Sequence, residues 1–243
     1  MLSAVDTVDI VLPIYNEEKS LRKNILALFD YLTKIADFSW NIIIADNAST
    51  DKTPEIGRSL SAAYDKIIYT RIDRKGRGYA LKAVFSQSNA DIVSYMDIDL
   101  STNLRHLKSL ICAMQQDYDA AIGSRLMPGA RVKRSMGREI LSRSYNALIK
   151  ILFFNKFSDA QCGFKAFKTS VVKQFIRMVE NNNWFFDTEI LLLMEHNKCR
   201  IFEVAVEWVE DMRTKVNIPK TILEDLSGLL RMRLTIHKKE IAQ

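Results

Sequence analysis

Long hydrophobic runs are missing from the sequence. No window of about 18 consecutive apolar residues occurs, so no membrane-spanning helix is predicted. The N-terminus lacks a basic stretch followed by an apolar core, which is the pattern of a secretory signal peptide. The three cysteines, Cys112, Cys162 and Cys199, are an odd number without paired spacing. These absences predict reduced thiols, a location on the cytosolic side, and only peripheral contact with any membrane.

Internal repeats, low-complexity stretches and linkers rich in proline or glycine are also absent, so nothing marks an independent second domain. No basic run interleaved with aromatic residues occurs, which argues against a nucleic-acid partner. The sequence does contain 48% hydrophobic residues, ample for the core of one large domain. Its net charge of +6 favours anionic partners such as nucleotides, phosphorylated lipids or membrane surfaces.

Short apolar strands alternate with helices in the first half of the chain. Strands are predicted at residues 8–12, 40–45, 66–71, 90–96 and 119–123, and helices at 16–30, after 53, and at 79–88. This alternation predicts an α/β fold with a mostly parallel central sheet and helices on both faces. Polar residues follow the strands at their carboxyl ends, where open sheets of this kind bind ligands.

Two carboxylates one residue apart, Asp97 and Asp99, follow the strand predicted at 90–96. Alternation along an extended backbone turns Ile98 away and places both carboxylates on one side, where a single divalent cation can be held. Oxygen ligands without histidine or cysteine nearby favour Mg²⁺ or Mn²⁺ over zinc. The competing interpretation is a solvated loop, because this pattern is common by chance.

The stretch from Gly123 to Gly137 is basic and irregular. It is followed at once by a further arginine, so that five cations lie close together in the sequence: Arg125, Arg131, Lys133, Arg134 and Arg138. Such a density indicates a phosphate site. The alternative is a solvated charge run that aids solubility.

Six segments in order resemble the family 2 glycosyltransferases of the GT-A fold, and among them the polyprenyl-phosphate (dolichyl-phosphate) sugar synthases. The segments are Pro13–Glu17, Ala45–Asp51, Gly76–Ala80, Asp97–Ser101, Gly123–Arg125 and Asp159–Lys165. The last of them, together with residues 184–189 and 206–208, is most similar to dolichyl-phosphate β-glucosyltransferases. The resemblance implies a Rossmann-like GT-A domain over residues 1–217, with a nucleotide-sugar half at 1–103 and an acceptor half at 104–217. An amphipathic, basic C-terminal helix is expected at 218–243.

The resemblance implies donor binding by the first half of the chain. The implied nucleotide-sugar contacts are Pro13, Tyr15, Glu17, Asp46, Lys75, Gly76 and Asp97. Tyr15 would pack on the base, Glu17 would accept from ribose hydroxyls, and Asp46 would receive the ring N–H of the base. Asp97 and Asp99 would hold Mg²⁺ or Mn²⁺ against the diphosphate.

Some positions leave alternatives open. The family commonly has a second acid and a glycine after the base-binding Asp, where this chain has Asn47 and Ala48. Ser101 matches a position where some relatives offer a further metal ligand, but it could equally cap the helix that follows. Asp187 and Glu189 begin an apolar helix, so capping and complementarity to the helix dipole compete with sugar binding.

The acceptor half has its own implied residues. Arg125 would hold the acceptor phosphate, with Arg134 or Arg138 completing the clamp, because a guanidinium binds phosphate in a fork. Asp159 would orient the acceptor or the sugar, or act as a base, with Gln161 as its polar companion. A lipid monophosphate is already an anionic nucleophile and needs little proton abstraction. Arg125, Asp159 and Gln161 are therefore the catalytic candidates.

Two amphipathic segments indicate how the chain meets a lipid. Residues 138–154 place Leu141, Tyr145, Leu148 and Leu152 on one face, which suits an in-plane interfacial helix or an ordinary core-facing one. Residues 218–237 are similarly amphipathic and lead into a basic end. We expect peripheral binding at the cytosolic face, alone or through a membrane-protein partner, unless the chain is part of a longer one that carries an anchor.

The predicted function is inverting transfer of a hexose, favoured as glucose from UDP-glucose, to polyprenyl or dolichyl monophosphate. Alternatives are a GDP-mannose-dependent mannose synthase and a family 2 transferase with a sugar-hydroxyl acceptor, for which Asp159 would be a true base. Outside enzymes, the alternative is an anionic-lipid or nucleic-acid binding module. A Rossmann dehydrogenase is disfavoured, because Gly76-x-Gly78 lies at the third strand and lacks the full glycine fingerprint.

Overall fold

The computed structural model of the chain describes residues 7–210 and 218–241. Its strands are β1 (Thr7–Ile14), β2 (Ser39–Asn47), β3 (Ile67–Ile72), β4 (Ile92–Met96), β5 (Ala120–Ser124), β6 (Arg131–Lys133), β7 (Phe164–Lys168), β8 (Ile201–Ala205) and β9 (Glu207–Val209). Its α-helices are α1 (Leu21–Ile35), α2 (Thr53–Ala63), α3 (Arg77–Gln87), α4 (Leu107–Gln115), α5 (Met136–Phe153), α6 (Thr169–Ile176), α7 (Phe186–His196) and α8 (Ile218–Thr235). Short 3₁₀ turns lie at Leu104–His106 and Ile236–Lys238.

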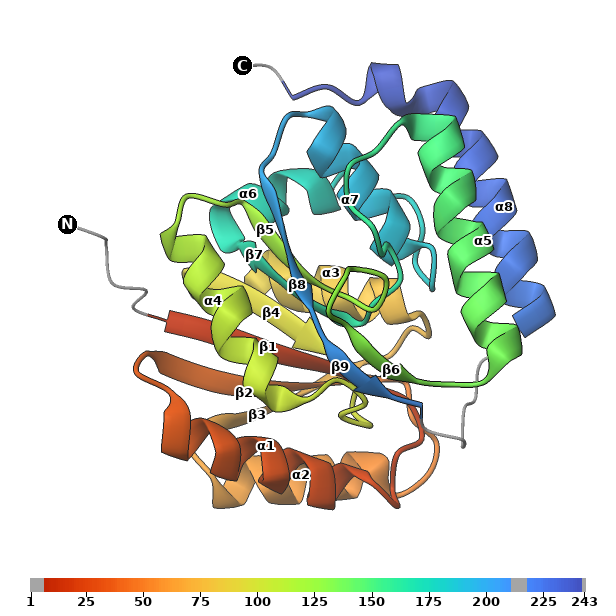
Figure 1. The fold of residues 1–243 in the computed structure, drawn as a ribbon. Coiled ribbons are helices and arrows are strands. Elements are labelled where there is room, and N and C mark those ends of the chain that lie inside the picture. The colour runs from red at the N-terminus through yellow and green to blue at the C-terminus, as the bar shows by residue number, and fades with distance from the viewer. Residues whose placement is uncertain (1–6, 211–217, 242–243) are drawn as a thin grey trace.

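The main sheet has seven strands in the order β3-β2-β1-β4-β7-β5-β8 (Figure 1). The pairs β1/β2, β2/β3, β1/β4 and β5/β8 are parallel, and β7 is antiparallel to both of its neighbours. A parallel two-stranded ribbon of β6 and β9 accompanies it. The predicted α/β fold with a mostly parallel sheet is therefore confirmed.

Helices cover both faces of the sheet. Alternation along β1 sends Val8, Ile10 and Leu12 into a core shared with α1, α2 and α4, whereas Val11 belongs to the opposite core with α3, α6 and α7. In Figure 1, α1 and α2 lie on one side of the sheet and α3, α6 and α7 on the other. With apolar layers on both faces, the loops at the strand ends are left to carry the polar residues.

The first helix begins later than predicted. A helix from residue 16 was expected, but α1 begins at Leu21 because residues 15–20 form a loop at the sheet edge. Asn16 has a φ of 54°. Its backbone N–H donates to the Ser49 hydroxyl at 2.9 Å, and its side-chain oxygen accepts from the Thr50 N–H at 2.8 Å. These bonds tie the loop after β1 to the loop after β2 and prevent residue 16 from entering the helix.

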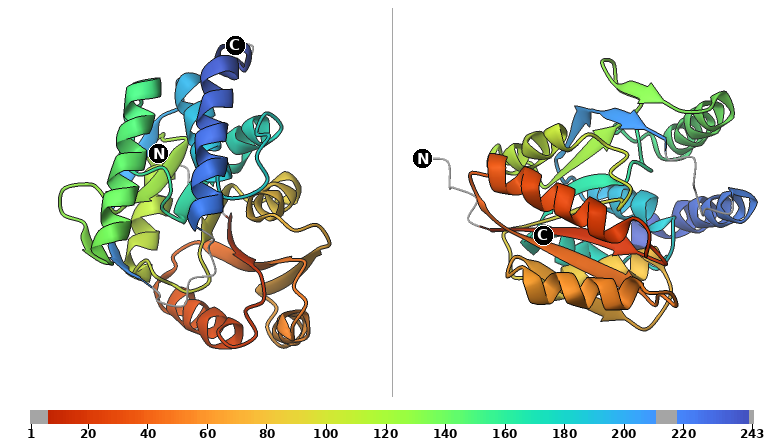
Figure 2. Two further views of the ribbon diagram at one scale, coloured as in Figure 1. Left: turned by 90° about the vertical axis from the view of Figure 1, so that its right-hand side faces the viewer. Right: turned by 90° about the horizontal axis from the view of Figure 1, so that it is seen from below.

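Helices α5 and α8 run alongside each other at one side of the molecule, and Figure 2 shows them as two adjacent columns. Leu229 and Met232 of α8 are buried in the core on the α3 side of the sheet. The predicted boundary between residues 217 and 218 adjoins residues 211–217, which lie outside the described residues, so that division stays a prediction. None of the helices in the described part of the chain combines the length and apolar character needed to cross a bilayer.

Candidate functional site

The carboxyl ends of three neighbouring parallel strands meet at one edge of the sheet. Strands β2, β1 and β4 end there, and side chains join their loops. The Glu17 N–H donates to the Thr53 hydroxyl at 2.7 Å, and the Gly76 N–H donates to Asn47 Oδ1 at 2.7 Å. Such an edge is where open α/β sheets bind nucleotides.

The residues predicted to contact the nucleoside surround this edge. Pro13 pairs with Ala45 across β1 and β2. The ammonium of Lys75 lies 4.0 Å from the ring centroid of Tyr15. Glu17 accepts a 2.5 Å hydrogen bond from the Ser20 hydroxyl. A planar aromatic face, a carboxylate and an exposed ammonium are thus presented on adjoining loops.

Asp46 is fully buried, and its carboxylate already has three donors. Oδ1 accepts from the Ser49 N–H at 2.9 Å, and Oδ2 accepts from the Tyr69 hydroxyl at 2.5 Å and from Arg71 Nη1 at 3.1 Å. Burial, with the adjacent Asp46 charge, raises the pKa of Tyr69 to about 12. A nucleotide base would have to share this carboxylate with the three donors, so its role as base receptor stays a prediction.

Strained backbone marks the same edge. Asn16, Ala48 and Leu100 follow β1, β2 and β4, and they have φ values of 54°, 58° and 54°. The left-handed region is costly for residues other than glycine and tends to occur at functional sites. A glycine at position 48 would adopt this conformation without the cost that Ala48 bears.

Asp97 and Asp99 lie at the rim of the site. The Asp97 side chain is 43% exposed, and its backbone N–H donates to the Gly163 carbonyl at 3.2 Å. Asp99 is exposed and accepts from the Ser101 N–H at 2.9 Å. The described residues contain no cluster of three or more His, Cys, Asp or Glu side chains that could hold a metal ion, so metal binding by Asp97 and Asp99 stays a prediction. Two carboxylates plus substrate phosphates form the donor set that Mg²⁺ usually accepts.

Ser101 does not cap the following turn. Asn103 does so, because its side chain accepts from the Arg105 N–H at 3.1 Å. The Ser101 hydroxyl is instead buried without a hydrogen-bond partner in the described structure. The capping interpretation is therefore wrong, and the metal-ligand interpretation stays a prediction.

A buried charge cluster lies behind Asp97. Arg77, the first residue of α3, donates to Asp97 Oδ1 at 2.9 Å through Nη2 and to Asp187 through Nη1. Asp187 also accepts from Lys165 Nζ at 2.8 Å and from the Tyr95 hydroxyl. Asp187 therefore does not cap α7, and it anchors the arginine that fixes the rim carboxylate.

The electrostatics of this cluster follow from burial. Burial raises the pKa of Asp187 to about 6, with the charge of Arg77 opposing the rise. Burial also lowers the pKa of Lys165 to about 7. Burial disfavours the charged form of Arg77, but Asp187 and Asp97 outweigh it and hold its pKa above the ordinary value. Arg77 thus stays a fixed cation between two carboxylates.

Glu189, the other acid in the first turn of α7, is also fully buried. Its carboxylate accepts from the N–H groups of residues 180 and 181 and from Arg231 of α8 at 2.8 Å. Glu189 therefore ties α8 to the body of the protein, and it makes no capping hydrogen bond. Both acids lie in the first turn of α7, where the helix dipole favours negative charge, and sugar binding by either of them stays a prediction.

Asp159 and Arg125 form a buried fork-to-fork ion pair. Arg125 donates through Nε at 2.8 Å and Nη2 at 2.9 Å, and its backbone N–H adds a third bond at 3.0 Å. The Gln161 N–H donates to Asp159 Oδ1 at 3.1 Å. Burial would raise the pKa of Asp159, but the charge and hydrogen bonds of Arg125 outweigh it and lower the pKa. Four donors thus hold the Asp159 carboxylate in its ionised form.

Two further arginines, Arg134 and Arg138, line one cavity together with Arg125. Arg134 donates to Glu139 through Nε at 2.5 Å, while its Nη2 is buried with no hydrogen-bond partner among the described residues. Arg138 pairs with Glu210 at 2.6 Å. Arg131 lies on β6, is largely exposed, and does not line the cavity.

The cavity itself has a volume of about 380 Å³ and lies between α5, α8 and the strand ends. Its polar end is formed by Arg77, Asp97, Arg125, Arg134, Arg138, Gln161, Asp187 and Asp225. Its apolar walls come from the two helices and consist of Leu141, Tyr145, Leu148, Ile222 and Leu226. The cavity therefore suits a ligand with an anionic head and an apolar tail.

Sequence reasoning missed Lys165 and Asp225. Lys165 interrupts the apolar run from Phe164 to Phe167, and a charge inside such a strand could have marked it. Asp225 shares the buried face of α8 with Leu229 and Met232 at helical spacing. An acid in an apolar stripe was the available signal.

Comparison with known proteins identifies the class. Residues 9–176 match glycosyl transferase family 2, and the chain belongs to that family. The fold is the GT-A fold, as predicted.

Individual relatives show which members of the family the chain resembles. The chain is 37% identical over 228 residues to glycosyltransferase AglD of Haloferax volcanii, covering 92% of this chain but 36% of that protein. It is 30% identical over 241 residues to dolichyl-phosphate β-glucosyltransferase ALG5A of Trichomonas vaginalis, covering 94% of this chain and 71% of the relative. It is 27% identical over 223 residues to human dolichyl-phosphate β-glucosyltransferase, covering 86% and 69%. The chain thus spans only about a third of the archaeal relative's length.

Among solved structures, glucosyl-3-phosphoglycerate synthase of Mycobacterium tuberculosis has a similar fold. Its complex with Mn²⁺, UDP-glucose and phosphoglyceric acid superposes with a TM-score of 0.68 at 16% identity, over 94% of this chain and 80% of that one. At this identity the likeness supports the fold alone.

Proposed function

We propose that the protein transfers glucose from UDP-glucose to a polyprenyl monophosphate, with inversion at the anomeric carbon and with Mg²⁺ or Mn²⁺. Family membership and the likeness to dolichyl-phosphate β-glucosyltransferases support this reaction. The observation that carries it is the cavity, which Arg125, Arg134 and Arg138 line together with apolar side chains of α5 and α8. A lipid phosphate has this combination of charge and apolar length.

Asp97 and Asp99 are central to the proposed binding of the nucleotide-sugar donor. The residues fit a divalent cation, which would neutralise charge on the diphosphate as it leaves. Arg77 holds the Asp97 carboxylate in place at 2.9 Å from Nη2. Tyr15, Glu17 and Lys75 offer stacking, hydroxyl and phosphate contacts for the nucleoside diphosphate.

The acceptor side explains why a phosphate is favoured over a sugar hydroxyl. Both Asp159 oxygens are engaged by Arg125 and by the Gln161 N–H, so Asp159 is not placed to remove a proton. A phosphate oxygen needs no such base. It attacks the anomeric carbon from the face opposite the diphosphate, the bond from that carbon to the diphosphate oxygen breaks, and UDP leaves with its electron pair. The arginines then serve to position the acceptor.

Transfer of radiolabel from two donors tests the proposal. UDP-glucose and GDP-mannose are each incubated with polyprenyl phosphate in detergent, with and without Mn²⁺. We expect solvent-extractable labelled lipid from UDP-glucose only, and only with the metal. Label from GDP-mannose alone would replace the proposed sugar, and label in neither case would refute the proposed reaction.

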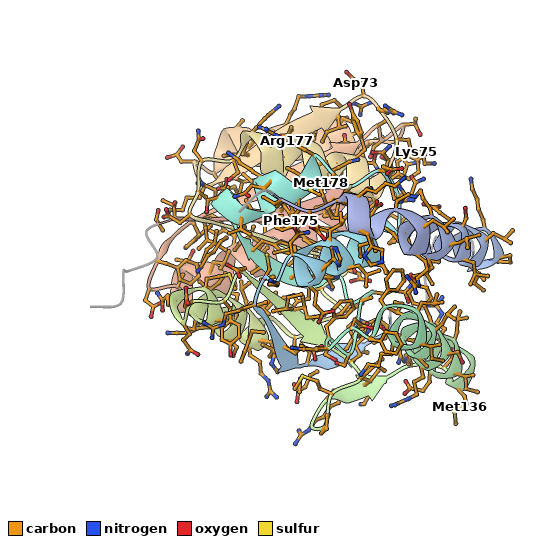
Figure 3. All side chains as sticks on the ribbon, turned by 90° about the horizontal axis from the view of Figure 1, so that it is seen from above. Asp73, Lys75, Met136, Phe175, Arg177 and Met178 are labelled. Carbon is orange, nitrogen blue, oxygen red and sulfur yellow. The ribbon has the colours of Figure 1, made fainter. Side chains whose placement is uncertain are left out.

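The outward faces of the helix pair suit peripheral membrane contact. Leu223, Leu230 and Leu234 of α8 are 69%, 64% and 69% exposed. Met136 is exposed at the outer end of α5 and points away from the body of the molecule (Figure 3). Exposed apolar side chains on the two helices that line the cavity would dip into the lipid from which the acceptor comes.

The double substitution Leu223→Ser with Leu230→Ser is expected to lower binding to anionic liposomes by about thirtyfold, because each exposed leucine contributes on the order of 1 kcal/mol when buried in lipid. Cosedimentation with vesicles of phosphatidylcholine and phosphatidylglycerol measures this. Ile68→Ser is the matched control, since Ile68 is an exposed apolar residue on β3. Equal binding by the double variant and the control would contradict the proposed surface.

Gly163→Ala is expected to abolish the metal-dependent stabilisation by nucleotide. A Cβ at residue 163 would lie 2.0 Å from Asp97 Oδ2, so the carboxylate would have to move. The measurement is the increase in melting temperature on adding UDP-glucose with Mn²⁺. Gly137→Ala is the control, because its Cβ would meet nothing within 4 Å. A wild-type increase in Gly163→Ala would argue against Asp97 as a ligand.

A further inference from the structure

Asp225 of α8 has no role in the chemistry derived above, yet it lies in the same cavity. The residue is 5% exposed and lines the polar end together with Asp97 and Arg125. Its Oδ2 accepts from Gln161 Nε2 at 2.9 Å. Its Oδ1 is buried and has no hydrogen-bond partner among the described residues. Buried polar atoms nearly always have a hydrogen-bond partner. A bound ligand can supply the partner that Asp225 Oδ1 lacks.

The position of Asp225 is not needed to hold α8 in place. Glu224 accepts from Asn181 Nδ2 at 2.8 Å, and Arg231 donates to Glu189 at 2.8 Å, so other side chains already tie the helix to the protein. Burial first, and then the negative charges of Glu224 and Asp187, raise the pKa of Asp225 to about 7. Asp225 is buried near two negative charges, and its Oδ1 has no hydrogen-bond partner among the described residues. Such an acid is better explained by binding of a ligand than by stability of the fold.

Only some chemical groups can be the missing hydrogen-bond partner of Asp225 Oδ1. A carboxyl oxygen accepts hydrogen bonds, and the polar end of the cavity also holds an unpaired donor, Arg134 Nη2. A diphosphate or an acceptor phosphate accepts from the arginine and offers no donor to an ionised Asp225, and a polyprenyl tail offers none either. A phosphate could pair only with the protonated carboxyl group, and loss of that contact would weaken UDP as much as UDP-glucose. The donors among the reactants of the proposed function are the base N–H, the ribose hydroxyls and the hydroxyl groups of the transferred hexose. The first two are assigned to Asp46 and Glu17, which leaves the hexose hydroxyls for Asp225.

We propose that Asp225 is a specificity-determining residue that accepts a hydrogen bond from a hydroxyl group of the transferred hexose. The inference rests on the proposed function. It gives α8 a second role beside contact with lipid, because the helix then also binds the sugar. Gln161, which holds the other oxygen, is its positioning residue.

Calorimetric binding of UDP and of UDP-glucose, each with Mn²⁺, tests this without requiring turnover. Asp225→Ala is expected to weaken UDP-glucose about tenfold and to leave UDP unchanged. Glu224→Ala is the matched control, since it removes an α8 contact that does not line the cavity, and it should change neither affinity. If Asp225→Ala fails to fold, Asp225→Asn keeps an acceptor for Gln161 and carries the same test.

A set of UDP-glucose analogues, each lacking one hydroxyl group, identifies the contact. One analogue should bind the wild type about tenfold more weakly than UDP-glucose, and the same analogue should show no such loss in Asp225→Ala. Equal weakening of UDP and UDP-glucose, or no weakening of either, would overturn the inference. Failure of the wild type to label polyprenyl phosphate would instead refute the proposed function, and the binding comparison would still stand as the test of Asp225.

Discussion

Asp159→Ala is expected to lower the free energy of unfolding by about 3–5 kcal/mol, because it leaves the buried Arg125 guanidinium without its counter-charge. Asp159 is fully buried, and Arg125 makes three hydrogen bonds to it. Urea denaturation followed by circular dichroism measures the change. The removal of one partner is costly in this way only where water cannot replace it.

Two comparisons separate this effect from a general loss of charge. Asp37→Ala removes an exposed partner of Lys108 and should change the free energy of unfolding little. The double variant Arg125→Met with Asp159→Leu removes both charges, and it should recover most of the stability while remaining inactive. A loss for Asp159→Ala no larger than that for Asp37→Ala would contradict the assigned burial of the pair.

Arg134→Met is expected to raise the KM for polyprenyl phosphate about ten- to a hundredfold, with a smaller effect on the KM for UDP-glucose. Its Nη2 is a buried donor with no partner in the described structure, and a charged hydrogen bond contributes about 1.5–3 kcal/mol. Glu139 keeps Arg143 as a partner at 2.5 Å, so the substitution leaves no isolated acid. Steady-state kinetics with each substrate varied in turn measure the effect.

Lys133→Met is the control for Arg134→Met. Lys133 belongs to the same basic stretch but is exposed on β6 and does not line the cavity. It should leave both KM values near those of the wild type. If the two substitutions raised the KM for polyprenyl phosphate equally, general attraction by the basic stretch would explain the result and a specific clamp would not.

Much of the donor half could be predicted from the sequence because its signals are local. The strands before Asp46 and Asp97 are short apolar runs with polar residues directly after them, and parallel pairing brings those ends together. The late start of α1 could not be predicted, because it depends on the bonds of Asn16 to Ser49 and Thr50, more than 30 residues away. Periodicity alone does not contain such long-range contacts.

The acceptor half was less predictable for the same reason. Strand β7 enters the sheet antiparallel between β4 and β5, and it carries Lys165 to a partner, Asp187, 22 residues away. The expected acid–base role of Asp159 could not be weighed without knowing that Arg125 occupies it. Asp225 was not among the predicted site residues, because its helix was interpreted only as a segment that contacts lipid.

The core-facing interpretation of the amphipathic pattern in α5 is confirmed in part. Tyr145, Leu148 and Leu152 of the predicted apolar face pack against the core on the α3 side of the sheet. Leu141, Tyr145 and Leu148 also line the cavity. Asn146 is buried, and its Oδ1 accepts from the Ala160 N–H at 2.9 Å, beside Asp159. The pattern could not predict that one face would serve both the core and a cavity, because the cavity is also lined by α8, which lies far away in the sequence.

The central claim is that the cavity between α5 and α8 binds a lipid phosphate as the acceptor. Its most direct test compares acceptors at one donor: UDP-[¹⁴C]glucose with Mn²⁺ is offered polyprenyl phosphate, the matching polyprenol, and a soluble alkyl glucoside. We predict label on polyprenyl phosphate and none on the other two. Label on the alkyl glucoside or the polyprenol, with polyprenyl phosphate inert, would contradict the claim and assign the cavity to a hydroxyl acceptor.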